Sequence, residues 1–189
     1  MPKKVTYSKF LNTDDVKDLG SALIELADRY PLALRTERDF FPLVEAYLHG
    51  RVPVLQAESN RSGGRVDFRV GGNNPALLEL AVAPRALKDP NDESVTFPGN
   101  KYKSQLYAVA NKPELAKLAK EKGAKARYLL LLDLRGEHDN ATLQAGYEKL
   151  VPKDKGHAPV TVVYVCKSRA PFSFSLGGQK RGRRRAGAA

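Results

Sequence analysis

Hydrophobic positions recur at helical spacing through the first fifty residues and at strand spacing after them. In residues 13–30, apolar side chains follow Thr13 every three or four positions, and Thr is a preferred N-cap residue. A second helix is predicted over residues 36–50, beginning at Thr36 and ending at Gly50. Three strands separated by Gly- and Asn-rich turns are predicted next, over residues 52–59, 64–70 and 76–82.

The second half of the chain alternates helical and strand patterns. A long polar stretch containing prolines follows the third strand, and we expect a loop that is mobile or ordered by a ligand. Further helices are predicted over residues 101–111, 111–123 with Asn111 as cap, and about 139–150. Further strands are predicted over residues 126–136, 160–168 and 172–176. This order predicts an α/β fold with a mixed central β-sheet and helices on both faces.

Length and composition indicate one domain of ordinary globular character. The chain has 189 residues, of which 42% are hydrophobic and 28% charged. We expect a single domain over residues 13–176, between a basic lead (1–12) and a basic disordered tail (177–189). With no long apolar run, no secretory signal and one cysteine, Cys166, the sequence predicts a cytoplasmic protein without a membrane partner. Cys166 lies in an apolar strand and is expected to be buried.

The chain is strongly basic, and its charge is not confined to the tail. The formal net charge is +11, and removal of the five basic residues in the last thirteen leaves about +6. Such an excess attracts polyanions, so we expect contact with nucleic acid. The alternative is a solubility feature, with the RGRRR segment disordered or bound nonspecifically to phosphate.

Two strands that are built for burial each carry a carboxylate. In GRVDFRV (64–70) and ALLELAV (76–82), side chains alternate between the faces, and pairing as a hairpin would bring Asp67 and Glu79 together. Two adjacent carboxylates repel unless a cation lies between them, which favours a site for Mg²⁺ or Mn²⁺. The alternative is that each acid pairs with a nearby arginine in a surface salt bridge. The arginines in reach are Arg65, Arg69 and Arg85.

The order of these segments resembles the PD-(D/E)XK superfamily, the restriction-endonuclease-like nucleases. The similarity covers roughly residues 36–134 and is carried by TERDFFPLVEAYL, GGRVDF, LLELAV and KYKSQLYAV. It implies that Asp67 and Glu79 bind the metal and that Glu37 is the first-helix carboxylate, touching the metal directly or through water. Glu45 is the competing choice, but Glu37 shares a helix face with apolar residues that point towards the core.

The sequence departs from that family at Ala81, where the pattern has a catalytic lysine two residues after the strand glutamate. Three interpretations remain open. The basic group has moved, to Lys101, Lys103 or Arg85; the chain is a natural relative that binds without cleaving; or a lysine was deliberately replaced by alanine.

The resemblance implies a metal-dependent endonuclease that acts on double-stranded or branched DNA, as a homodimer where both strands are cut. Gln105 is placed beside the site as a catalytic candidate, and Tyr102 and Tyr107 as stacking candidates or core residues. The predicted nucleic-acid contacts are Arg65, Arg69, Arg85, Lys101 and Lys103. The alternatives are a non-catalytic DNA- or RNA-binding protein of the same fold, and an RNA- or ribosome-associated protein. The three histidines show no ligand spacing and are expected at the surface or at helix caps.

Overall fold

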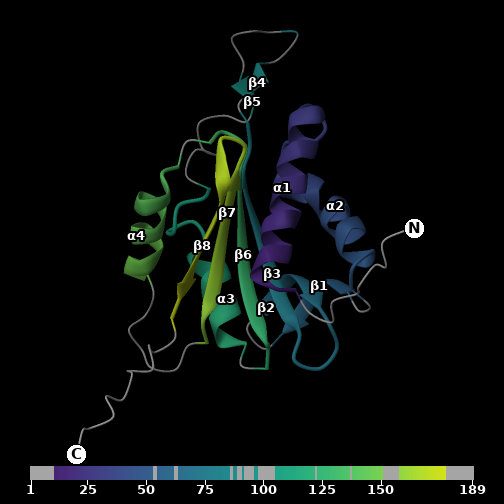
Figure 1. Cartoon of the computed structure of the whole chain (residues 1–189), viewed down its shortest axis with the longest axis vertical. Helices are drawn as coiled ribbons and strands as arrows, with labels where there is room; N and C mark the ends of the chain where they lie inside the picture. Colours follow the sequence, from purple (N-terminus) through teal and green to yellow (C-terminus); the bar gives the residue numbers. More distant parts are fainter. Residues whose placement is uncertain are drawn as a thin grey trace, which may run out of the picture.

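A six-stranded mixed β-sheet flanked by four helices forms the protein, as the sequence pattern predicted (Figure 1). The computed structural model describes residues 11–52, 55–61, 64–85, 87–88, 91, 96–97, 105–121, 123–136, 138–150 and 158–177. The helices are α1 (Thr13–Arg29), α2 (Glu37–His49), α3 (Lys112–Lys120) and α4 (Asn140–Leu150). The sheet strands are β1 (Leu55–Arg61), β2 (Gly64–Val70), β3 (Ala76–Ala83), β6 (Ala126–Asp133), β7 (Val160–Cys166) and β8 (Arg169–Leu176).

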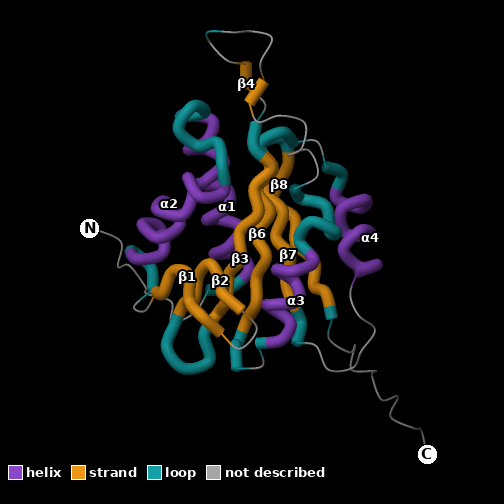
Figure 2. Tube along the Cα trace, turned by 180° about the vertical axis from the view of Figure 1, so that it is seen from behind, coloured by secondary structure: helices purple, strands orange, loops and turns teal. Residues whose placement is uncertain are grey.

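The strand order across the sheet is β1-β2-β3-β6-β7-β8. β3, β6 and β7 are parallel to one another, and the remaining neighbours pair antiparallel. The three parallel strands lie at the centre, where both faces are covered, which explains the almost continuous burial of β3 and β6. Figure 2 shows the same sheet from behind, with β3 and β6 side by side.

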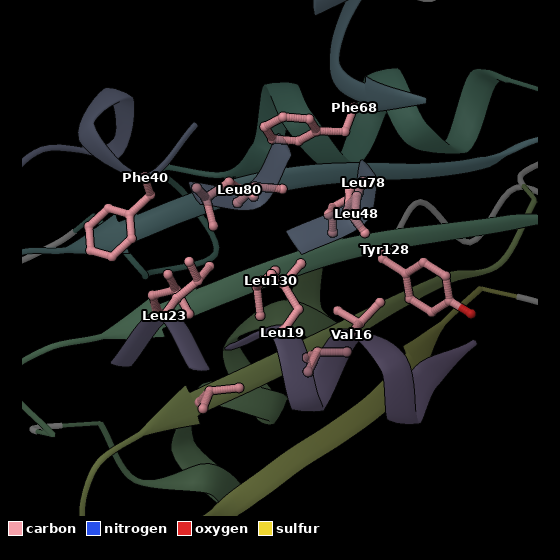
Figure 3. Close-up of a cluster of buried hydrophobic side chains, with 14 of the residues drawn as sticks. Val16, Leu19, Leu23, Phe40, Leu48, Phe68, Leu78, Leu80, Tyr128 and Leu130 are labelled. Carbon is pink, nitrogen blue, oxygen red and sulfur yellow. The ribbon is translucent and has the colours of Figure 1, made fainter. Parts of the chain in front are cut away.

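Two hydrophobic cores lie on opposite faces of the sheet. One packs α1 and α2 against the sheet, with Leu19, Phe40, Leu78 and Leu130 among its buried side chains (Figure 3). The other packs α3 and α4 against the opposite face, with Leu118 and other apolar side chains buried there. Side chains of β3 alternate between these two cores, as the strand pattern predicted.

Several boundaries differ from the sequence prediction. The N-cap of α1 is Asn12 and not Thr13, because the Asn12 side chain accepts hydrogen bonds from the amides of Asp14 and Asp15. The predicted lead therefore includes two ordered residues, since Leu11 is also buried in the core. Strand β8 begins at Arg169, earlier than the predicted edge strand, because it pairs with most of β7.

The stretch after β3, predicted to be a loop, contains a short second hairpin of β4 (Leu87–Lys88) and β5 (Thr96–Phe97). The predicted tail lies outside the described residues apart from Gly177.

The helix predicted over residues 101–111 is wrong for its described part, residues 105–111, which form consecutive turns. The side chain of Asn111 donates to the carbonyl oxygens of Gln105 and Tyr107 at 2.7 and 3.3 Å, and Tyr147 Oη donates to the carbonyl of Leu106. Side chains that take up backbone groups in this way compete with helix formation. Asn111 precedes α3 as expected, but its side chain makes no cap hydrogen bond to the helix.

Candidate active site

The candidate site forms where β2 separates from β3. The two strands pair from Val70 opposite Ala76 to Phe68 opposite Leu78. One further step in the same register places Asp67 across from Glu79, and residues opposite each other in an antiparallel pair project from the same face. At this point Asp67 Oδ2 accepts a hydrogen bond from the backbone amide of Leu80 at 2.9 Å, so a side-chain oxygen takes the place of a backbone carbonyl of β2.

This separation also corrects one detail of the predicted strand pattern. Val66 was expected to share a face with Phe68, but the two side chains pack in different cores. Val66 turns towards the α3 side, the same side as the Glu79 face of β3. The strict alternation of side chains between the two faces therefore ends at Asp67, whose carboxylate accepts a hydrogen bond from the backbone amide of Leu80 on β3.

The Asp67 and Glu79 side chains interact directly, and both are shielded from water. Burial and the adjacent Asp67 charge together raise the pKa of Glu79 to about 8, against the opposing effect of Lys117. Burial also raises the pKa of Asp67, although the hydrogen bond from Leu80 lowers it. The pair therefore favours sharing a proton unless positive charge is supplied.

A lysine that the sequence analysis missed supplies part of that charge. Lys117, on α3, places its Nζ 3.0 Å from Glu79 Oε1 and 3.9 Å from Glu114 Oε1. Nζ also donates to the carbonyl oxygen of Arg65 at 3.0 Å, which fixes it between α3 and β2. The contact with Glu79 is an ion pair without hydrogen-bond geometry, because Oε1 is buried and accepts no hydrogen bond from the described residues.

The signal for Lys117 was present in the amphipathic pattern of residues 112–120. Leu118 is buried from this helix, and Glu114 and Lys117 lie one turn apart beside it. The helix could therefore be predicted, but its docking against β2 and β3 could not be read from the sequence.

Glu37 is the first residue of α2 and reaches the same pocket. Partial burial, together with the charges of Asp67 and Glu114, raises the pKa of its carboxylate to about 7, although the residue as a whole remains exposed. Glu45, the competing choice, lies two turns further along the helix and does not line the pocket. The structure thus brings Glu37, Asp67 and Glu79 together.

The pocket has a volume of about 210 Å³. Gln105 lines it, as predicted for a residue beside the site, although Gln105 belongs to a turn and not to a helix. Ala81 also lines it, and its side chain is 4% exposed within the core on the α3 side. The wall is completed by residues of β3 and of the α3 region, namely Leu80, Val82, Ala110, Asn111, Glu114 and Lys117.

Two of the arginines considered as salt-bridge partners, Arg85 and Arg69, bond to other groups. Arg85 pairs with Asp28 at the end of α1, so it neither neutralises Asp67 nor replaces the missing lysine. Arg69 donates to Gln56 Oε1 and to the carbonyl of Gly72, and Arg65 is exposed on β2. Tyr102 lies outside the described residues. So do Lys101 and Lys103, which were predicted to replace the missing lysine and to contact nucleic acid.

The donor set of the pocket fits a hard divalent cation. Asp67 and Glu79 present adjacent oxygens, one of them the buried Glu79 Oε1 without a hydrogen bond. Mg²⁺ is commonly held by one or two carboxylates together with water or substrate oxygens. Across the described ranges, no group of three or more His, Cys, Asp or Glu is arranged to hold a metal, so the site would rely on this pair.

Neither the family models nor the curated proteins contain a match to this chain. None of the four helices combines the length and apolar character needed to cross a membrane, within the part of the chain that the structure describes.

Proposed function

We propose that this protein is a metal-dependent endonuclease that hydrolyses phosphodiester bonds in DNA, with Lys117 in the role left vacant by Ala81. The observation that carries the proposal is the Lys117 ammonium group 3.0 Å from Glu79 in the pocket that also contains Asp67 and Glu37. The order α2, β1–β3 and β6 supports the resemblance to the PD-(D/E)XK nucleases in part, although the helix before β6 is α3 and not the segment 101–111 on which the resemblance rested.

Asp67 and Glu79 would hold Mg²⁺ or Mn²⁺, which would polarise the scissile phosphate and lower the pKa of a bound water. The water oxygen forms a bond to phosphorus, the bond from phosphorus to a sugar oxygen breaks, and the leaving oxygen takes up a proton. Lys117 Nζ would orient the attacking water and stabilise negative charge on the phosphate in the transition state. Glu37 would bind a water molecule beside the carboxylate pair.

The basic character of the chain supports DNA as the polyanionic substrate. Action as a homodimer follows from the need to cut two strands and stays a prediction.

The second candidate is a non-catalytic DNA-binding protein of the same fold. It is favoured by the tight packing of Ala81, which leaves this strand position apolar on the buried side of the sheet. In that case, Lys117 would only neutralise the two acids.

Cleavage of linear, supercoiled and branched DNA with Mg²⁺ or Mn²⁺ tests the proposal, using the original chain, Lys117→Met and Ala81→Lys. We expect the original chain to cleave, and Lys117→Met to lose about 100-fold or more in rate, as expected when one group that stabilises transition-state charge is removed. Lys120→Met, on an exposed position of the same helix, is the matched control and should retain activity.

Other outcomes decide between the alternatives. Cleavage only by Ala81→Lys would mean that the fold is a nuclease but that Lys117 does not replace the missing lysine. If neither the original chain nor Ala81→Lys cleaves DNA while both bind it, the binding-protein alternative is correct.

A further inference from the structure

A second pocket, of about 240 Å³, lies on the other side of the turns at residues 105–111. Gln105, Ala110 and Asn111 line the acidic pocket described above, whereas Tyr107 and Ala108 line the second pocket. The same short segment therefore forms a wall of both. The two pockets are therefore neighbours along this segment.

One wall of the second pocket is an aromatic ring that the sequence analysis considered either a stacking or a core residue. Tyr107 is 52% exposed, so it is not a core residue, and its ring meets the imidazole of His138 edge-on with centroids 5.2 Å apart. Ala108, Leu143 and Gly146 provide apolar surface. Exposed aromatic rings beside apolar surface are the usual platforms for unpaired bases.

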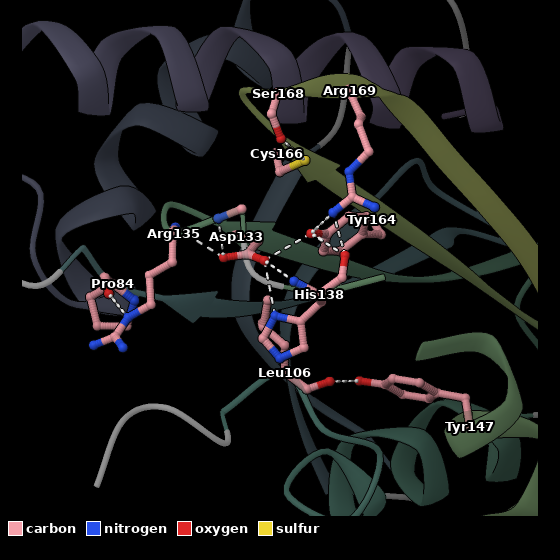
Figure 4. Close-up of polar contacts among 11 residues, drawn as sticks. Pro84, Leu106, Asp133, Arg135, His138, Tyr147, Tyr164, Cys166, Ser168 and Arg169 are labelled. Carbon is pink, nitrogen blue, oxygen red and sulfur yellow. Dashed lines mark hydrogen bonds and ion pairs between the residues drawn. The ribbon is translucent and has the colours of Figure 1, made fainter. Parts of the chain in front are cut away.

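The imidazole of His138 lines this pocket, and one of its nitrogens is buried without a hydrogen-bond partner among the described residues. His138 is 8% exposed, contrary to the surface or cap position expected for it, and its Nδ1 lies 2.9 Å from Asp133 Oδ2. Asp133 is fully buried and also accepts hydrogen bonds from Tyr164 Oη and from backbone amides (Figure 4). Because an ionised carboxylate can only accept, the shared hydrogen belongs to Nδ1, and when the ring carries no second proton Nε2 is an acceptor.

In Figure 4 the imidazole extends from Asp133 towards the Leu106 segment, which continues into Tyr107. Nε2 of His138 is buried and has no hydrogen-bond partner among the described residues. A ligand that enters beside Tyr107 would offer this nitrogen a donor.

A second acceptor lies on the same pocket and sets its charge. Asp139 precedes α4, and its Oδ2 accepts a hydrogen bond from the amide of Thr142 at 2.9 Å. Hydrogen bonds from Thr142 lower the pKa of the Asp139 carboxyl, which keeps it ionised. A negative charge here disfavours phosphate and favours the amino and imino groups of a base.

We infer that the second pocket binds one unpaired nucleobase of the DNA strand, stacked on Tyr107 with its donor edge towards His138 Nε2 and Asp139. Guanine fits best, because its N1–H and N2–H₂ groups are adjacent donors, whereas thymine has a single donor between two acceptors. The volume is below the roughly 300 Å³ typical of pockets for drug-sized ligands, which agrees with a single ring system. The inference builds on the proposed function by naming the substrate: DNA with an unpaired base beside the cleavage site.

Titration of the full-length protein with 2′-deoxyguanosine or thymidine at about pH 8, without divalent metal, tests the pocket directly. The readout is the set of ¹H–¹⁵N shifts of Ala108, Thr142, Leu143 and Gly146 amides. We expect deoxyguanosine to shift these signals and to bind at least about threefold more tightly than thymidine. Tyr107→Ala should weaken deoxyguanosine binding about threefold or more by removing the stacking surface.

Gly146→Leu is the decisive variant, because it fills the pocket from α4 without removing a polar group. A Cβ at Gly146 would meet only Ala108 Cβ, at 4.0 Å, so the helix accommodates a side chain there. Gly146→Leu should abolish the shifts, whereas Gly146→Ala is the matched control and should keep them.

The inference is overturned if deoxyguanosine leaves these amides unchanged, if thymidine binds equally well, or if Gly146→Leu still binds. The metal-free titration does not depend on cleavage, so the two proposals can fail separately. Base binding without any cleavage would refute the proposed nuclease activity and support the base pocket. Cleavage without base binding would support the nuclease activity and refute the base pocket.

Discussion

At the scale of single residues, the buried charge of the acidic pocket lowers the stability of the fold. Glu79 is 1% exposed and lies against Asp67, with the Lys117 ammonium as its close positive partner among the described residues. Its folded-state pKa of about 8 lies above the ordinary glutamate value of 4.5. Holding both acids ionised therefore costs free energy in the metal-free protein, which is the expected property of a site adapted to a cation.

The stability of the metal-free protein should fall as pH rises through this range. Because folding raises the pKa of Glu79, its contribution is fully present below pH 4.5 and is lost as pH rises through about 8. Glu79→Gln removes the titrating group. The free energy of unfolding of this variant should therefore fall less than that of the original chain as pH rises. We expect the variant to exceed the original chain by about 1–2 kcal/mol near pH 9.

Urea unfolding between about pH 5 and pH 9 checks this expectation. Exposed Glu148→Gln is the matched control and should follow the original chain at every pH. A Glu79→Gln variant that declines as steeply as the original would show that Glu79 titrates normally.

At the scale of elements, close packing decides details that local preferences do not reveal. Gly20 lies in the middle of α1, where glycine is a poor helix former. A Cβ at this position would lie 2.6 Å from Val165 Cγ2 and 3.1 Å from Leu130 Cδ1. The glycine therefore allows α1 to approach β6 and β7 closely, and β-branched Val165 has little rotamer freedom to yield.

Gly20→Ala should destabilise the fold by about 1–3 kcal/mol, because the added methyl group overpacks the core. This effect should outweigh the higher helix propensity of alanine. Gly146→Ala in α4, where the nearest atom to the new Cβ is 4.0 Å away, should instead stabilise by about 0.5–1 kcal/mol. Chemical denaturation of both variants gives the comparison. Equal effects of the two substitutions would contradict close packing at Gly20.

At the scale of the whole molecule, the positive charge determines how the protein meets DNA. The net charge of +11 falls to about +6 when the last thirteen residues are removed. Phosphate contacts release counterions, so the logarithm of the binding constant decreases linearly with the logarithm of salt concentration.

Deletion of residues 177–189 should weaken binding to nonspecific duplex DNA at low salt and reduce the magnitude of this slope by up to about four, if the basic side chains contact phosphates. Fluorescence anisotropy between about 50 and 200 mM salt measures both quantities. Substitution of the terminal AGAA by four serines leaves the charge unchanged and controls for tail sequence. An unchanged slope after the deletion would place the DNA contacts on the body of the protein.

The extent of the sequence prediction can be followed at individual residues. The alternation of GRVDFRV and ALLELAV was sufficient to place Asp67 and Glu79 together, because an antiparallel hairpin fixes which residues are opposite. It failed at Val66, because the pairing of β2 with β3 ends at Phe68 and the ladder no longer fixes the residues before it. It also failed at residues 105–111, where side chains of Asn111 and Tyr147 take the carbonyl groups that a helix needs.

Periodicity and local pairing were enough to predict helices α1 to α4, the six strands of the main sheet, the mixed α/β architecture and the acid pair. Three-dimensional packing was needed to show that Lys117 reaches Glu79, that Arg85 instead meets Asp28, and that the buried His138 contacts Tyr107. The physical reason is that each of these contacts depends on how a helix or turn docks on the sheet. Docking is set by shape and packing across the whole core, and no short stretch of sequence contains it.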